Sequence, residues 1–177
     1  KFGLVSDAGT PLISDPGYKL VRECVRSMIK ITHVPGASSL TSSLVLSGLP
    51  SHNFFFGGFL DKNKIKKKKQ LENALNLKFT SLWYESPNRL AETIKLIIKI
   101  NNDALISVLR ELTKLNEEVI NGSPSFVYDQ ISKKTKLKGE IVLVISNKNQ
   151  IHYTKEMILD LIKQNYSKLS TKELALH

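Results

Sequence analysis

The first fifty residues alternate short apolar runs with loops of small residues. Phe2 to Val5 is apolar enough for a buried strand, and residues 6–17 that follow are mainly small, polar and turn-forming. Side chains of this size let a ligand approach the backbone closely. The pattern predicts a strand that opens onto a binding loop, although a connecting turn without a ligand has the same composition.

A helix is predicted next, because apolar residues recur at helical spacing from Leu20 to Met28. Ser14 or Asp15 can cap this helix, and Pro16 suits its first position because a helix does not need the missing N–H there. A strand, a loop and a capped helix make half of a βαβ unit. In open α/β sheets the ligand crevice lies beyond the carboxyl ends of such strands.

The same arrangement then repeats. A second apolar run at residues 29–34 leads into the small residues 35–39, and a second helix is expected from Leu40 until Gly48 and Pro50 stop it. Two such units in succession predict a parallel sheet with both loops at one edge. The hydroxyls of Ser38 and Ser39 can bind a ligand there or simply cap the helix.

The composition changes near residue 52, where we place a domain boundary. Strands are expected at residues 54–60, 79–84, 104–109, 119–122 and 138–146, with helices between them. The predicted class is α/β with two domains: an N-terminal parallel sheet (1–52) and a mixed α/β domain (53–148). Residues 149–177 are expected to begin a helical extension. Because both chain ends interrupt a predicted element, we expect missing residues on each side and an incomplete N-terminal sheet.

Charged residues cluster just beyond two of these strands. Glu85 and Arg89 follow the strand at 79–84, and Arg110, Glu111, Lys114 and Glu117 follow the strand at 104–109. Ion pairing among them is one interpretation. The other is an active site, because sites in mixed α/β folds form on loops just beyond strand ends.

A run of lysines, which includes Lys66, Lys67, Lys68 and Lys69, leads into a helix beginning near residue 70. A charged run is usually a solvated helix face. The alternative is contact with a phosphate backbone, in which each lysine would steepen the salt dependence of binding.

Composition limits the classes of protein that remain. The 177 residues carry a formal net charge of +10, which attracts polyanions, and 41% are hydrophobic, which suffices for a core. No apolar run approaches the roughly 20 residues that span a bilayer, so no membrane is expected and a cytoplasmic location is predicted. The single cysteine, Cys24, and the scattered histidines predict neither an intrachain disulfide nor a metal site.

Seven motifs in order resemble one family, the tetrapyrrole methylase superfamily, and within it the enzymes that methylate a cytidine 2′-oxygen of 16S rRNA. The motifs are VSDAGTPLISDPG (5–17), VPGASS (34–39), SGLP (47–50), GFL (58–60), YESPNRL (84–90), RELTK (110–114) and KGE (138–140). Such an ordered series is more specific than any one motif.

The resemblance implies a two-domain α/β homodimer that binds S-adenosylmethionine between its domains, and 16S rRNA or the assembled small ribosomal subunit as substrate. It implies donor contacts at Asp7, Ala8, Gly9, Thr10, Ile13, Ser38, Ser39, Tyr84, Glu85 and Leu112. Lys66 to Lys69, Arg89 and Arg110 are the candidates for RNA contact. Glu85, Glu111, Lys114 and Glu117 are the candidates for the catalytic base, with Lys114 competent only if its pKa is lowered.

The chain departs from the family pattern at several positions. Thr10 replaces the superfamily aspartate, in agreement with the rRNA branch, whereas Asn88 replaces that branch's histidine and Asp61 its proline. A first strand and its loop are also absent, so we expect this chain to be incompetent alone. Two alternatives stay open: a tetrapyrrole methyltransferase, and a non-enzymatic RNA-binding module that uses the lysine run.

Overall fold

The computed structural model describes residues 2–7, 9–134, 136–147 and 159–160. Residues 1–147 make one compact unit and residues 148–177 a second. The helices expected from residue 154 onward lie outside the described residues, apart from residues 159 and 160. The domain boundaries expected near residues 52 and 148 remain predictions.

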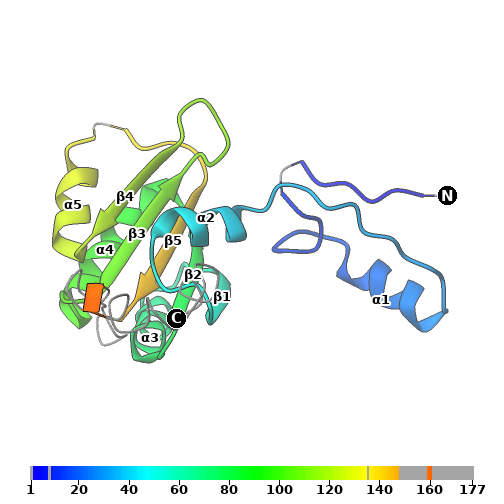
Figure 1. Cartoon of the computed structure of the whole chain (residues 1–177), viewed down its shortest axis with the longest axis horizontal. Helices are drawn as coiled ribbons and strands as arrows, with labels where there is room; N and C mark the ends of the chain where they lie inside the picture. Colours follow the sequence, from blue (N-terminus) through cyan, green and yellow to red (C-terminus); the bar gives the residue numbers. More distant parts are fainter. Residues whose placement is uncertain (1, 8, 135, 148–158, 161–177) are drawn as a thin grey trace. The chain divides into compact units, whose positions relative to one another are not determined.

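A five-stranded sheet forms the centre of the first unit (Figure 1). Its strands are β1 (Phe54–Phe59), β2 (Thr80–Glu85), β3 (Leu105–Arg110), β4 (Glu118–Gly122) and β5 (Ile141–Ser146), in the spatial order β1-β2-β5-β3-β4. β1 and β2 are parallel, and the other three pairings are antiparallel. The mixed α/β domain predicted from the sequence is therefore confirmed.

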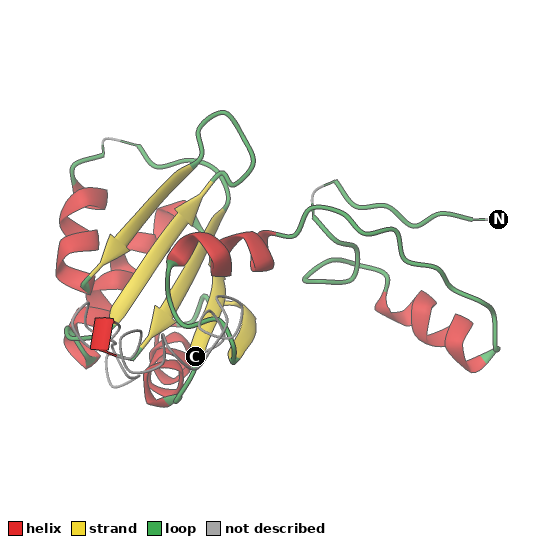
Figure 2. Cartoon of the chain, in the orientation of Figure 1, coloured by secondary structure: helices red, strands yellow, loops and turns green. Residues whose placement is uncertain are grey.

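Helices cover both faces of this sheet (Figure 2). The described helices are α1 (Tyr18–Arg26), α2 (Ser39–Ser47), α3 (Lys64–Asn76), α4 (Pro87–Ile100) and α5 (Pro124–Ser132). Apolar side chains of α3, α4 and α5 pack with one set of strand residues into the main core. Leu44 of α2 packs with a second set, which includes Leu82, Leu109 and Val142.

Side-chain alternation along β2 divides its residues between the two faces. Leu82 and Tyr84 lie in the cluster with α2, whereas Trp83 lies in the core with α3, α4 and α5. Glu85, the next residue, bonds to side chains of α3 and α4. Tyr84 and Glu85 are thus neighbours in sequence whose side chains serve opposite faces of the sheet.

The two strands expected before residue 35 do not form, which corrects the sequence prediction. No described residue before Phe54 lies in a strand, and residues 2–5 and 29–34 have no ladder partner in the described chain. Val5 and Val34 are 87% and 83% exposed. Apolar composition favours a strand, but a strand exists only where a second backbone accepts its hydrogen bonds.

The predicted cap of the first helix is also wrong. α1 begins at Tyr18 after Gly17, with no side-chain cap bond, so neither Ser14 nor Asp15 caps it. Gly17 has φ +127°, and this turn sets the helix start two residues later than expected. A capping side chain must belong to the residue directly before the helix. Asp15 is therefore left for another role.

Candidate functional site

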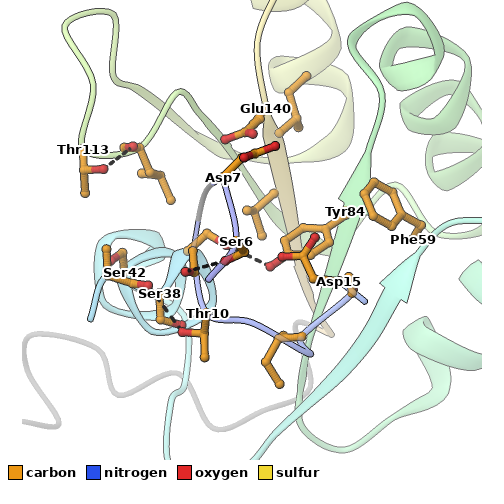
Figure 3. A pocket seen from close by; sticks show the side chains of 18 of the residues that line it. Ser6, Asp7, Thr10, Asp15, Ser38, Ser42, Phe59, Tyr84, Thr113 and Glu140 are labelled. Carbon is orange, nitrogen blue, oxygen red and sulfur yellow. Dashed lines mark hydrogen bonds between the residues drawn. The ribbon is translucent and has the colours of Figure 1, made fainter. Parts of the chain in front are cut away.

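One cavity of about 690 Å³ gathers most of the predicted site residues (Figure 3). It lies beyond the carboxyl end of β2, where the loops before α1 and α2 meet the β3–β4 loop and the start of β5. Its size suits a nucleoside-sized ligand. The predicted residues that line it are Asp7, Gly9, Thr10, Ile13, Ser38, Ser39, Tyr84, Glu85, Leu112 and Lys114.

Other predicted residues fall outside this lining. Ala8 lies outside the described residues. Glu111 and Glu117 are on the adjacent loop but do not line the cavity. The cavity also contains residues that were not predicted from the sequence to bind a ligand, including Asp15, Ser42, Phe59, Gly139 and Glu140. Phe59 and residues 139–140 belong to motifs quoted above, so the motifs marked the segments without identifying the side chains.

Two small-residue loops make the first wall. The Thr10 hydroxyl donates to the Ala37 carbonyl over 3.5 Å, which links the loop before α1 to the loop before α2. Gly9, Leu12 and Ser14 have φ between +61° and +74°. Positive φ is uncommon for residues other than glycine, and such strained backbone is frequent in ligand-binding loops.

Aromatic residues make the second wall. The hydroxyls of Tyr84 and Ser39 lie 2.9 Å apart, so β2 is hydrogen-bonded to the first residue of α2. The Tyr84 ring meets Phe56 and Phe59, each with a centroid distance of 5.1 Å. Phe56 and Phe59 would face opposite ways in a regular strand; the register shift between them, with Gly58 at φ +70°, brings both rings to Tyr84.

The third wall joins the β3–β4 loop to the chain entering β5. The Glu111 N–H donates to the Glu140 carbonyl, and the Glu140 N–H donates to the Glu111 carboxylate over 2.9 Å. Gly139 has φ +98°, and a Cβ there would lie 2.4 Å from the Glu111 side chain. Glycine is required at this position because only its backbone allows both the turn and the close approach.

The charges on this wall argue against two of the predicted bases. Hydrogen bonds to Glu111 and Glu140 raise the pKa of Lys114, so its ammonium does not become the neutral amine that a base requires. The Glu140 backbone N–H, together with Lys114, lowers the pKa of Glu111, which weakens that carboxylate as a proton acceptor. Glu117, a third candidate, is exposed and accepts a hydrogen bond from the Thr113 N–H.

Glu85, the fourth candidate base, is held in a buried network behind the cavity. Its Oε2 accepts from Lys67 Nζ over 2.9 Å and from the Thr93 hydroxyl over 2.7 Å. Its Oε1 accepts from Arg89 Nη2 and from the Ser86 N–H, both over 2.7 Å. The carboxylate is wholly buried and both oxygens are bonded, so it positions the β2–α4 turn and has no free lone pair aimed at a substrate.

Lys67 does not belong to an RNA-binding surface, which corrects the expectation for the lysine run. It is 3% exposed and bonds to Glu85 and Thr93. The other three lysines are exposed, because successive residues of a helix point to different sides; they are Lys66, Lys68 and Lys69. A run of like charges in the sequence thus divides into one buried ion-pair partner and three surface cations.

Both arginines expected to contact RNA are engaged within the chain. Arg89 pairs with Glu85, while its Nε and Nη1 are buried without a partner among the described residues. Arg110 pairs with Glu118 over 3.0 Å and donates to the Lys138 carbonyl. Burial raises the pKa of Glu118, but hydrogen bonds from Lys134 and Arg110 outweigh it, and the net shift is downward. Both arginines therefore anchor carboxylates in this structure.

The described part of the chain lacks two other features. Within it, no group of three or more His, Cys, Asp or Glu side chains is arranged to hold a metal ion. None of the described helices combines the length and the apolar composition needed to cross a bilayer.

This sequence and fold match a known protein family. A sequence model of the Tetrapyrrole (Corrin/Porphyrin) Methylases matches residues 3–125. The chain belongs to that family, as the motifs predicted.

Curated relatives match a longer part of the chain than the family model does. The chain is 42% identical over 154 residues to "Ribosomal RNA small subunit methyltransferase I" of Hydrogenobaculum sp., which covers 84% of this chain and 64% of the relative. Proteins with the same name from Thermotoga maritima and Bacillus subtilis are 42% and 37% identical, covering 84% and 98% of this chain and 66% and 57% of the relatives. The chain thus spans 57% to 66% of the length of these three curated relatives.

Solved structures agree on the fold. The methyltransferase CobJ aligns with a TM-score of 0.57 at 16% identity, over 79% of this chain and 62% of CobJ. The native uroporphyrin III C-methyl transferase of Thermus thermophilus aligns with a TM-score of 0.51 at 16% identity, over 84% and 64%. The predicted tetrapyrrole-methylase-like fold is confirmed.

Substituting Lys67 tests the buried network. Lys67→Met keeps the aliphatic stem but removes the ammonium, and we expect it to lower the free energy of unfolding by about 3 kcal/mol, because a buried carboxylate then loses a partner. Lys68→Met is the matched control: Lys68 is exposed, and its one ion pair among the described residues is with Glu72 over 3.5 Å, so the loss should stay below about 0.5 kcal/mol. Urea unfolding of both variants measures the difference, and equal losses would contradict the network.

Proposed function

We propose that the full-length protein transfers a methyl group from S-adenosylmethionine to the 2′-oxygen of a cytidine in 16S rRNA of the small ribosomal subunit. The observation that carries this proposal is the convergence of six of the seven motifs on one cavity. The name shared by the curated relatives supports the choice of substrate.

The cavity fits the methyl donor chemically. Small-residue loops expose backbone near Gly9 and Ser38, and Tyr84 with Phe59 supplies an apolar aromatic wall for a nucleoside. Carboxylates in the lining suit a ligand that carries positive charge. We propose donor contacts at Asp7, Gly9, Thr10, Ile13, Ser38, Ser39, Tyr84 and Leu112, with Glu85 holding the turn behind them.

When bound, S-adenosylmethionine supplies an electrophilic methyl group on a sulfonium. The contribution of this chain is alignment and exclusion of water, which together can supply much of the rate of an in-line displacement. The Ser39–Tyr84 hydrogen bond and the Glu85 network fix one wall, and the Glu111–Glu140 bonds fix another. The four predicted bases are bonded elsewhere or unsuited by pKa, so we propose that positioning dominates over base strength.

The RNA and the second subunit complete the proposal. Lys66, Lys68 and Lys69 form an exposed cationic patch, here called the α3 lysine patch, which can contact phosphates. A homodimer is supported by the apolar side chains that α1 leaves exposed, including Leu20 and Val25. A ribosomal substrate implies a cytoplasmic location.

Methyl transfer to two substrates separates this function from its rivals. With labelled donor, we expect incorporation into small ribosomal subunits, at a ribose whose 3′ phosphodiester then resists alkali, and none into a porphyrinogen.

Tyr84→Phe should lower kcat/KM about three- to tenfold, because it removes one hydrogen bond from the wall of the site. Tyr128→Phe, outside the cavity, is the matched control.

Label in the porphyrinogen would instead favour the tetrapyrrole methyltransferase. RNA binding without any donor affinity would favour the non-enzymatic module.

The salt dependence of RNA binding tests the α3 lysine patch. The triple variant Lys66→Gln, Lys68→Gln and Lys69→Gln keeps Lys67 and should flatten the slope of log K against log salt by about 2, since each phosphate contact contributes roughly 0.7 to 0.9. Lys95→Gln, Lys99→Gln and Lys133→Gln together remove the same charge from exposed positions on α4 and at the end of α5. Equal slopes for the two triple variants would show that the patch is only a solvated face.

A further inference from the structure

The cavity and the whole chain have opposite charge. The chain carries +10, yet the acidic and basic residues of the cavity lining are four acidic residues and one lysine: Asp7, Asp15, Glu85, Glu140 and Lys114. A surface that attracts RNA thus surrounds a pocket that disfavours phosphate. This contrast points to a cationic ligand inside the cavity.

Two of the four carboxylates are already compensated. Glu85 is paired with Lys67 and Arg89, and Glu140 is paired with Lys114 over 3.0 Å. Asp7 and Asp15 have neither an ion pair nor a hydrogen bond within the part of the chain that the structure describes. Their charges are the ones available to a ligand.

Asp15 is the better placed of the two. Asp15 is half-buried, whereas Asp7 is exposed, so water screens the charge of Asp15 less than that of Asp7. The neighbouring Ser14 Oγ lies 3.9 Å from the point that a Cβ would occupy if Gly58 carried one. The loop that holds Asp15 therefore lies against the end of β1. Figure 3 shows the Asp15 side chain in the part of the cavity where Tyr84 and Phe59 lie. A carboxylate in the cavity that makes no bond to another described residue is available to recognise charge.

We propose that Asp15, assisted by Asp7, makes this pocket select the cationic methyl donor over its neutral product. The proposal rests on the proposed function. S-adenosylmethionine carries a sulfonium, an ammonium and a carboxylate, and is a net cation. When the oxygen–methyl bond forms, the electron pair of the carbon–sulfur bond stays on sulfur, and the hydroxyl proton leaves to solvent. The resulting thioether has no net charge, so the carboxylates hold the product less tightly than the donor.

The selection is tested by measuring how the full-length protein binds two analogues of the donor, one neutral and one cationic. S-adenosylhomocysteine is neutral overall, and sinefungin carries an ammonium in place of the methylsulfonium. Asp15→Asn should weaken sinefungin binding about tenfold, as expected for one partly screened charge a few ångströms away, and change S-adenosylhomocysteine binding less than about twofold. Asp15→Glu keeps the charge and should retain the wild-type preference for sinefungin.

Asp129→Asn is the matched control, because it makes the same change at an exposed position of α5 outside the cavity. It should alter neither affinity in calorimetry. If Asp15→Asn lowers the affinity for both ligands equally, Asp15 contacts the ligand without selecting charge. If neither affinity changes, Asp15 has no role. Either result overturns the inference. If the wild-type protein binds neither ligand, the proposed function fails and the inference falls with it.

Discussion

The buried carboxylate of Glu85 is the interaction on which the site depends. A charge removed from water is tolerated only when opposite charges and hydrogen bonds compensate it. Lys67 from α3, Arg89 and Thr93 from α4 and the backbone N–H of Ser86 supply that compensation. These partners come from separate elements, so the network fixes α3 and α4 relative to the end of β2.

The network reaches the cavity through the alternation of the strand. Because Glu85 is held on the face covered by α3 and α4, Tyr84 must point to the opposite face, where its hydroxyl meets Ser39 and its ring meets Phe56 and Phe59. The buried Glu85 network therefore sets the direction of the aromatic wall. The same logic operates on the opposite wall, where Gly139 allows Glu111 to lie against the chain that enters β5.

Much of the second half of the fold was predictable from the sequence. The five strands of the described chain were all expected from their sequence, and Pro87 and Pro124 mark two helix starts. The loops at strand ends also indicated where the cavity lies. The segments 2–5 and 29–34 were not predictable in the same way, because pairing depends on a second backbone and not on local composition.

The roles of individual charged residues were the least predictable. Lys67 and Lys68 are identical in type and adjacent in sequence, yet one is buried against Glu85 and the other is exposed. Asp15 is typical of a helix cap in the sequence but lines the cavity instead. Such roles are decided by contacts between distant segments, which a single sequence does not reveal.

A crystal structure of the full-length protein with S-adenosylhomocysteine tests most directly whether this cavity receives the methyl donor. We predict that the ligand lies between the Gly9–Thr10 loop, Ser38 and Tyr84, while Glu85 keeps its bonds to Lys67 and Arg89. A ligand bound elsewhere, or a Glu85 carboxylate that leaves Lys67 to contact the ligand, would contradict this account.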